Sequence, residues 1–248
     1  MRVAVIGLGG TGSAAARFLA EAKHTVIAYE QFAVGHARGS SHGESRIIRK
    51  TYPDSFLTAM MGEAYELWSA LEKEAGEELF VRTGGLYFGP RDLPELRAVE
   101  NALVEQNVPF SILSQADVAA RFPAIKLERD EVAILQADSG FLRASRVVTA
   151  NVALAKRHGV VVRDETLVRE IANRGDSVVV TTADGTTDEF DAALVTAGPW
   201  TQKVFAAAPL PLRVSRQEIV YLEIATNADR LAPSRCPVWI DATTHHYG

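Results

Sequence analysis

The chain contains little cysteine and no excess of basic side chains. Its only cysteine among 248 residues is Cys236, so no internal disulfide can form, no thiolate metal cluster is expected, and a reducing cytoplasm fits best. Lys and Arg number 26 against 31 Asp and Glu, which leaves a formal net charge of −5. A chain without a broad basic face is not expected to bind nucleic acid or anionic membranes. These absences favour a small-molecule partner and leave the oligomeric state open.

Apolar runs long enough for a membrane helix are also missing. Residues 3–20 follow Arg2 and could be mistaken for a secretion signal, but Arg17 and several patterned glycines interrupt the run. The sequence holds no internal repeat and no low-complexity tract. With 47% apolar residues, the chain has the composition of a soluble globular protein that buries a core.

Apolar periodicity predicts an α/β chain. Strands are expected at 3–6, 25–29, 83–88, 132–136, 160–163, 177–182, 187–190 and 192–196. Helices are expected at 13–21, 56–75, 93–106, 115–121 and 143–158. We interpret this order as a discontinuous nucleotide-binding domain, residues 1–75 and 141–205, and a second domain of residues 76–140 and 206–248.

A glycine-rich turn opens the chain. Gly7, Gly9 and Gly12 match G-x-G-x-x-G between a predicted strand and a predicted helix, and Glu30 ends the next strand. The glycines suit a tight turn, close approach of a pyrophosphate, and close packing of helix on strand, while the acidic residue suits two ribose hydroxyls. The negative charge of Glu30 would repel a 2′-phosphate, so FAD or NAD is favoured over NADP. The motif alone does not separate FAD from NAD.

A second motif suggests a family. Residues 39–49, Gly-Ser-Ser-His-Gly-Glu-Ser-Arg-Ile-Ile-Arg, resemble the G-S-x-H-G-[DE]-[ST]-R-x-x-R stretch of monomeric sarcosine oxidases and N-methyltryptophan oxidases. The resemblance covers essentially the whole chain, with further matches at Tyr52, 66–68, 71–74, 83–90, 139–140, 193–200 and 246–248.

The resemblance implies a fold, a cofactor and a reaction. The fold would be α/β, with a Rossmann-like FAD-binding domain and a second, incomplete α+β substrate domain. The reaction would be FAD-dependent oxidation of a secondary amine, an N-methyl or cyclic amino acid, by hydride transfer to the flavin, with hydrogen peroxide formed if oxygen is the acceptor. Two alternatives stay open: a non-catalytic fragment that binds FAD or only its ADP moiety, and an NAD-dependent dehydrogenase.

The resemblance also implies roles for individual residues. Arg46 matches an arginine against the flavin ring, Arg49 one that grips the substrate carboxylate, and Tyr247 a tyrosine of the amine pocket. The predicted cofactor-binding set is Gly7, Gly9, Gly12, Glu30, Ser41, His42, Ser45, Arg46, Val168, Gly198 and Trp200. Without the resemblance, the two arginines would be assigned to a solvated loop, His42 to loop packing and Tyr247 to an ordinary strand.

The sequence also departs from the family pattern. The family extends beyond the position of Gly248 and there carries a flavin-linking cysteine, a lysine that promotes reaction with oxygen, and a last glycine-rich segment. Cys236 does not match the linking cysteine and is expected to be a small buried thiol. We therefore expect any flavin bound by this chain to be non-covalent, the chain alone to be inactive, and the sheet near Tyr247 to be incomplete. The identity of the amine and of the electron acceptor stays open.

Overall fold

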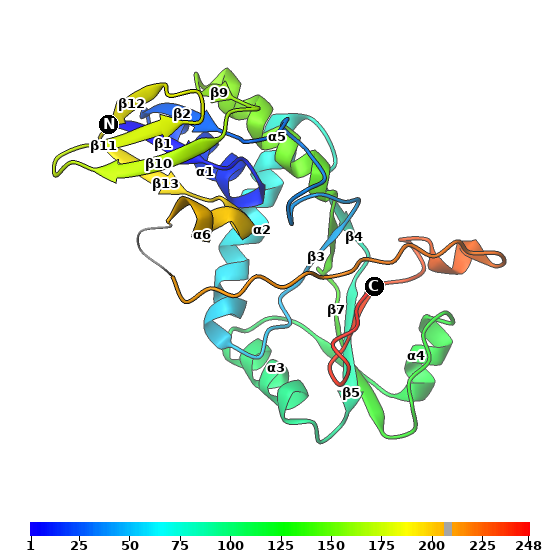
Figure 1. The fold of residues 1–248 in the computed structure, drawn as a ribbon. Helices are drawn as coiled ribbons and strands as arrows, with labels where there is room; N and C mark the ends of the chain where they lie inside the picture. Colours follow the sequence, from blue (N-terminus) through cyan, green and yellow to red (C-terminus); the bar gives the residue numbers. More distant parts are fainter. Residues whose placement is uncertain (206–209) are drawn as a thin grey trace. The chain divides into compact units, whose positions relative to one another are not determined.

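The computed structural model describes residues 1–205 and 210–248 (Figure 1). By its contacts the chain forms two compact units: a first unit of residues 1–44 and 144–219, and a second unit of residues 45–143 and 220–248. The sequence predicts a boundary at residue 75 instead. Residues 206–209, where the predicted second domain resumes, lie outside the described residues.

The two divisions differ mainly over one helix. Helix α2 (Ser55–Ala75) packs against α3 (Pro94–Glu105) and β4 (Phe80–Arg82), so it belongs to the second unit by compactness. Its predicted place in the first domain rested on its position in the sequence, which does not determine the partners of a helix. The functional division into cofactor and substrate domains stays a prediction.

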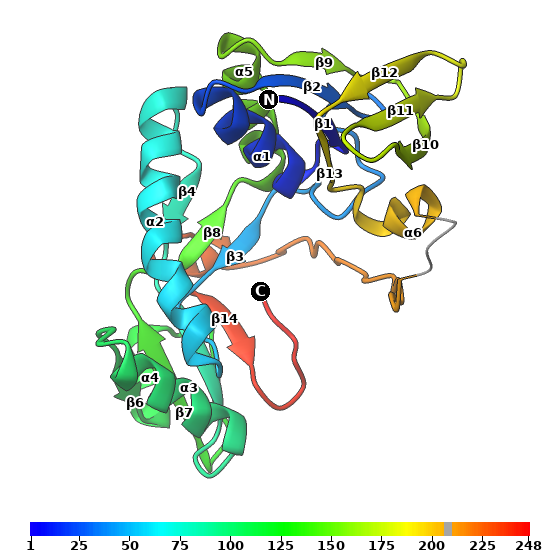
Figure 2. The same cartoon turned by 90° about the vertical axis from the view of Figure 1, so that its left-hand side faces the viewer.

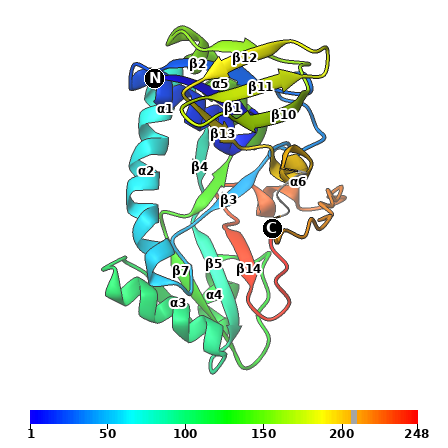
Figure 3. The same cartoon turned by 60° about the vertical axis from the view of Figure 1, so that its left-hand side comes forward.

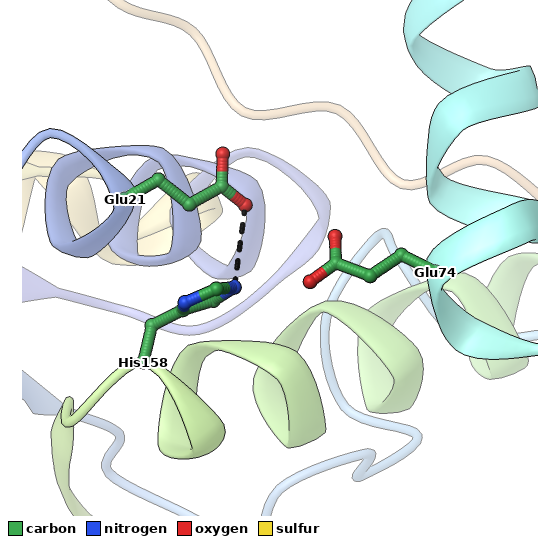
Figure 4. Close-up of side chains that lie close together, drawn as sticks. All are labelled: Glu21, Glu74 and His158. Atoms are coloured by element: carbon green, nitrogen blue, oxygen red, sulfur yellow. Dashed lines mark ion pairs between the residues drawn. The ribbon is translucent and has the colours of Figure 1, made fainter.

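A parallel sheet forms the centre of the first unit. Its strand order is β13 (Ala192–Val195), β1 (Arg2–Ile6), β2 (Thr25–Tyr29) and β9 (Val161–Arg163), and every neighbouring pair is parallel. Helices α1 (Gly10–Glu21) and α5 (Ala144–Arg157) pack together, and an ion pair joins Glu21 to His158, just past the end of α5, at 3.7 Å (Figure 4). Because parallel strands need covered faces, this arrangement explains their nearly continuous apolar sequences.

The two faces of this sheet are covered differently. Alternate residues of β1 and β2 point to opposite sides, as the strand period requires. One side packs against α1 and α5 through Val5, Val26, Ala28, Ala16, Ala20, Val152 and Ala155. The other side packs against a three-stranded antiparallel sheet, β10 (Val168–Asn173), β11 (Val178–Thr182) and β12 (Thr187–Phe190) (Figure 3). The contact residues on this side are Ala4, Ile6, Ile27, Tyr29, Val168, Val180 and Phe190.

A charged cluster joins the parallel sheet to the antiparallel one. The hydroxyl of Tyr29 donates to Asp188 Oδ2 at 2.7 Å, the guanidinium of Arg163 donates to the same oxygen, and Arg2 lies 3.4 Å from Oδ1. Burial alone would raise the pKa of Asp188, but the hydrogen bonds from Tyr29 and Arg163 outweigh it and hold the pKa below its usual value. The cluster links strands β1, β2, β9 and β12.

The second unit contains two sheets (Figure 2). In the larger, β14 (Val238–Asp241) lies parallel to β5 (Gly85–Pro90), followed by the antiparallel strands β7 (Glu131–Gln136) and β6 (Ser111–Leu113). Helix α3 covers the face of Tyr87, Ile134 and Ile240, and helix α4 (Gln115–Arg121) the face of Leu86, Ala133 and Trp239. The smaller sheet joins β3 (Arg46–Ile48), β8 (Gly140–Leu142) and β4.

The fold class predicted from the sequence is confirmed, and each predicted helix and strand has its counterpart. The sequence missed the three-residue strands β3, β4, β6 and β8, and it missed β10. It also missed the short helical segments at Gly198–Trp200, α6 (Thr201–Val204) and Ala228–Leu231. Within the described residues, no helix has both the length and the apolar character needed to cross a membrane.

Candidate functional site

The turn after β1 is built so tightly that only glycine fits two of its positions. Gly7 adopts a φ of 97°, and its N–H donates to the Tyr29 carbonyl at 2.7 Å. A Cβ added at Gly12 would lie 1.8 Å from the Gly7 carbonyl oxygen and 2.4 Å from Thr196 Oγ1. The hydroxyl of Thr196 in turn donates to the Gly7 carbonyl at 2.8 Å. The ends of β1, β2 and β13 therefore meet at this turn.

The amino end of α1 begins directly at the turn. Gly9 is its N-cap and offers no capping side chain, and the first turn of this fully described helix holds no acidic residue. The Gly10 N–H donates to Ser41 Oγ at 2.8 Å, and a Cβ at Gly9 would lie 3.0 Å from the same oxygen. A helix amino end with backbone N–H groups and no acidic residue in its first turn is suited to an anionic group.

Glu30 stands at the carboxyl end of β2 and is almost fully buried. Its Oε2 accepts from the Leu8 N–H at 2.9 Å, and its Oε1 accepts from the Phe32 N–H at 3.1 Å. His36 Nε2 lies 3.4 Å from Oε1. These donors hold the carboxylate next to the glycine-rich turn, which is the placement expected from the motif.

A cavity of about 530 Å³ lies in the first unit, over these strand ends. Its walls come mainly from residues 6–11, 29–31, 39–42, 166–168 and 195–200. The volume and the mixture of apolar walls with a few polar groups are typical of a small-molecule site.

The structure brings most of the predicted cofactor-binding residues to this cavity. Those that line it are Gly7, Gly9, Glu30, Ser41, His42, Val168, Gly198 and Trp200. Gly12 packs beneath the turn against Gly7. Ser45 and Arg46 belong to the second unit, as do Arg49 and Tyr247. The roles of all these residues stay predictions.

The sequence analysis did not single out His36, Lys203 or Thr196, which also line the cavity. The ring of His36 contacts Phe32, with centroids 4.8 Å apart, and lies 6.4 Å from the Trp200 ring. His36 is a lone histidine in a loop without periodicity, so neither motif nor pattern marks it. The one available signal was its position six residues after Glu30.

Arg49 contacts two aromatic rings within the second unit. Its guanidinium lies 4.5 Å from the ring centroid of Tyr52 and 5.4 Å from that of Tyr87, and it donates to the Thr51 carbonyl at 2.7 Å. Burial and a hydrogen bond to Glu95 raise the pKa of Tyr87, so its hydroxyl stays protonated and donates. Cation–π contacts with two rings and a hydrogen bond to the backbone restrict the movement of this guanidinium.

The other predicted catalytic residues lie elsewhere in the second unit. Arg46 begins β3 and donates to the Ser45 carbonyl at 2.8 Å. Tyr247 is 64% exposed and pairs with Ile240 beside β14, in the larger sheet. The chain therefore places the two predicted arginines on or next to one strand and the tyrosine on a different sheet.

Comparison with known proteins identifies the family. Residues 2–248 match the family of FAD dependent oxidoreductases, which is nearly the whole chain. The chain belongs to the FAD-dependent oxidoreductase family. This confirms the resemblance seen in the sequence and establishes FAD, rather than NAD, as the cofactor of the family.

Individual members of the FAD-dependent oxidoreductase family agree with this assignment. Human peroxisomal sarcosine oxidase is 36% identical over 98% of this chain and 63% of its own length. The N-methyl-L-tryptophan oxidase of Citrobacter koseri is 30% identical over 84% of this chain and 56% of its own length. The solved structure of NikD, an amino acid oxidase essential for nikkomycin biosynthesis, matches 83% of this chain and 53% of its own with a TM-score of 0.75 and 28% identity. The chain thus spans about 60% of the length of the curated relatives.

Proposed function

We propose that the cavity of the first unit binds FAD, with the ADP half over the glycine-rich turn. The observation that carries this proposal is the convergence of Gly7, Gly9 and Glu30 on one cavity, over a turn against which Gly12 packs, in a chain of this family. The pyrophosphate would lie at the amino end of α1, where Gly9 permits close backbone approach. The ribose hydroxyls would bind Glu30, and the backbone at Val168 would contact the adenine.

The remaining assignments of the cofactor set are part of the same proposal. Ser41, His42, Gly198 and Trp200 line the cavity and are suited to contact the rest of the dinucleotide. Ser45 and Arg46 are proposed contacts of the flavin ring. The support for these two is the motif at residues 39–49, which continues the loop that lines the cavity, together with the family match.

The reaction we propose is the oxidation of a secondary amine, an N-methyl or cyclic amino acid. FAD when bound supplies a hydride acceptor for the C–H beside nitrogen. Arg49 would bind the substrate carboxylate through its planar fork, Arg46 would lie against the flavin, and Tyr247 would line the amine pocket. Two observations support this reaction. Arg49 contacts the rings of Tyr52 and Tyr87, and the relatives include a sarcosine oxidase and an N-methyl-L-tryptophan oxidase.

The cofactor assignment is tested by the flavin content of matched valine variants. A Gly9→Val side chain would extend from a Cβ already 3.0 Å from Ser41 Oγ and into the pyrophosphate position, so we expect the variant to lose FAD binding. A Cβ at Gly62 would meet no described atom within 4 Å, so Gly62→Val is the control for the substitution itself. Equal flavin content in Gly9→Val and the parent would refute the site.

The reaction is tested by mixing the FAD-loaded protein anaerobically with sarcosine, N-methyltryptophan and pipecolate. We expect one of these amines to reduce the flavin, seen as loss of its visible absorbance, in a protein that contains this chain and the remaining length of its relatives. Peroxide and dye-reduction assays then distinguish an oxidase from a dehydrogenase. Stable FAD binding without reduction by any amine would favour the alternative of a non-catalytic flavin-binding protein.

The proposed compartment is the cytoplasm, where Cys236 would remain a thiol. Burial raises the pKa of this thiol, which keeps it protonated and slow to react. Imaging of a tagged chain in its host cell tests the compartment.

A further inference from the structure

The ring of His36 is held in a fixed orientation at the edge of the cavity. Its side chain is 18% exposed. The Phe32 ring meets it edge-on with centroids 4.8 Å apart, and the Trp200 ring does the same at 6.4 Å. Phe32 and Trp200 are themselves 5.5 Å apart, so the three rings form one cluster. Such edge-to-face packing restricts the rotation of the imidazole about its Cβ–Cγ bond.

A backbone hydrogen bond selects the tautomer of this imidazole. The Arg38 N–H donates to His36 Nδ1 at 3.0 Å, so Nδ1 is an acceptor and the ring proton lies on Nε2. His36 Nε2 lies 3.4 Å from Glu30 Oε1, so the N–H on that side faces the carboxylate. The Nε2 edge of the histidine thus lies beside the Glu30 carboxylate in a fixed direction.

The Glu30 carboxylate receives its donors on defined sides. The backbone N–H groups of Leu8 and Phe32 each hold one oxygen, and His36 Nε2 adds a polar contact with Oε1 at 3.4 Å. A carboxylate offers about four acceptor positions, so acceptor capacity remains chiefly on Oε2. Both Glu30 and His36 line the cavity. The groups around this carboxylate, His36 Nε2 among them, therefore decide where the remaining acceptor positions point.

We propose that His36 is a positioning residue that orients Glu30 toward the ribose hydroxyls of the bound dinucleotide. This inference rests on the proposed FAD site. Its physical basis is preorganisation: a carboxylate already held at the binding angle loses little freedom when the ribose arrives. Removing the imidazole leaves Glu30 held by the two backbone N–H groups alone, which gives its free acceptor positions more freedom to turn away from the ribose.

The test crosses two variants with two ligands. His36→Phe keeps an aromatic ring beside Phe32 and Trp200 but removes the hydrogen bond at Nδ1 and the Nε2 contact with Glu30. His36→Gln can place its amide N–H near the position of Nε2 and so keeps the donor. Calorimetry measures the affinity of each protein for ADP and for 2′,3′-dideoxy-ADP, which lacks both ribose hydroxyls. We expect the parent and His36→Gln to prefer ADP by roughly tenfold, and His36→Phe to prefer it by about threefold or less.

The ratio of affinities separates positioning from mere packing. If His36 had a purely structural role, His36→Phe would weaken the binding of ADP and of 2′,3′-dideoxy-ADP equally and leave the preference for ADP unchanged. That result would overturn the inference. Loss of the preference in His36→Gln would overturn it as well, which covers the case of a Phe variant that fails to fold. If the parent binds neither ADP nor FAD, the proposed cofactor site itself is wrong, an outcome that differs from any change in the ratio.

Discussion

The two compact units differ in how far their proposed roles depend on backbone or on side chains. In the first unit, Gly7, Gly9 and Gly12 act through the space and the N–H groups of the main chain, at the point where three strands end. In the second unit, the guanidinium of Arg49 contacts the rings of Tyr52 and Tyr87, which lie 3 and 38 residues further along the chain. A site formed by the backbone leaves a short motif in the sequence. A site formed by side chains depends on packing partners that are distant in the sequence.

The largest effect should come from the glycine that packs beneath the turn. Gly12→Val would place a Cβ 1.8 Å from the Gly7 carbonyl oxygen, so the turn must open and the first unit should lose about 3 kcal/mol or more of unfolding free energy. Gly62→Ala, on the exposed side of helix α2, should instead gain about 0.5–1 kcal/mol. Urea unfolding followed by circular dichroism measures both. If Gly12→Val and Gly62→Ala changed the unfolding free energy by similar amounts, the special role of the backbone at the turn of the first unit would be contradicted.

The next largest effect is expected from Arg49 in the second unit. Arg49→Ala removes a bidentate partner for a carboxylate, so binding of an N-methyl amino acid should weaken by roughly a hundredfold while FAD content stays normal. Arg97→Ala, at an exposed position of helix α3, is the control for loss of one positive charge. The readout is the Michaelis constant or a substrate-induced change in the flavin spectrum. An unchanged constant in Arg49→Ala would remove this arginine from the site.

A smaller effect is expected at the charged cluster of the first unit. Asp188→Asn weakens hydrogen bonds from Tyr29 and Arg163 and should cost about 2 kcal/mol near neutral pH. Because the folded pKa of Asp188 lies below its usual value, its stabilisation is complete above the unfolded pKa of about 4 and is lost as pH falls through the folded pKa. Unfolding measured from pH 7 down to about pH 3 should therefore show a shallower acid decline in Asp188→Asn than in the parent. Parallel curves would contradict this assignment.

The smallest effect should come from the tyrosine beside Arg49. Tyr87→Phe removes one hydroxyl that donates to Glu95 and keeps the ring under the guanidinium, so we expect a loss of about 1 kcal/mol in unfolding free energy. Tyr87→Leu removes the ring as well and should, in addition, raise the Michaelis constant through Arg49. If Tyr87→Phe and Tyr87→Leu gave the same Michaelis constant, the Tyr87 ring would not contribute to the orientation of Arg49.

The strands and helices were predictable where their pattern was long. The strands at 3–6 and 25–29 show apolar runs because both of their faces are buried, and the helix at 56–75 has an N-cap at Asp54 and a glycine at 76. The strands at 46–48 and 140–142 hold three residues each, too few to show a period. The compact units change over at residues 44 and 45 instead of residue 75, because the place of helix α2 depends on packing partners that the sequence does not name. The functional division at residue 75 stays a prediction.

The candidate site shows the same limit. Gly7 and Glu30 were predictable because a positive φ and a carboxylate at a strand end leave a motif. His36 was not, because its importance arises from Phe32, Trp200 and the Arg38 N–H, which surround it only after folding. Thr196 ends a predicted strand, yet its hydrogen bond to the Gly7 carbonyl joins residues 189 apart.

The central claim, that the first unit seats the ADP half of FAD, is tested most directly by a competition titration. The purified chain is titrated with FAD while its visible spectrum is followed, and then with ADP. The account predicts one FAD bound per chain and its displacement by ADP, because both occupy the turn at Gly7, Gly9 and Gly12. Binding of FAD that excess ADP does not displace, or no binding of FAD at all, would contradict it.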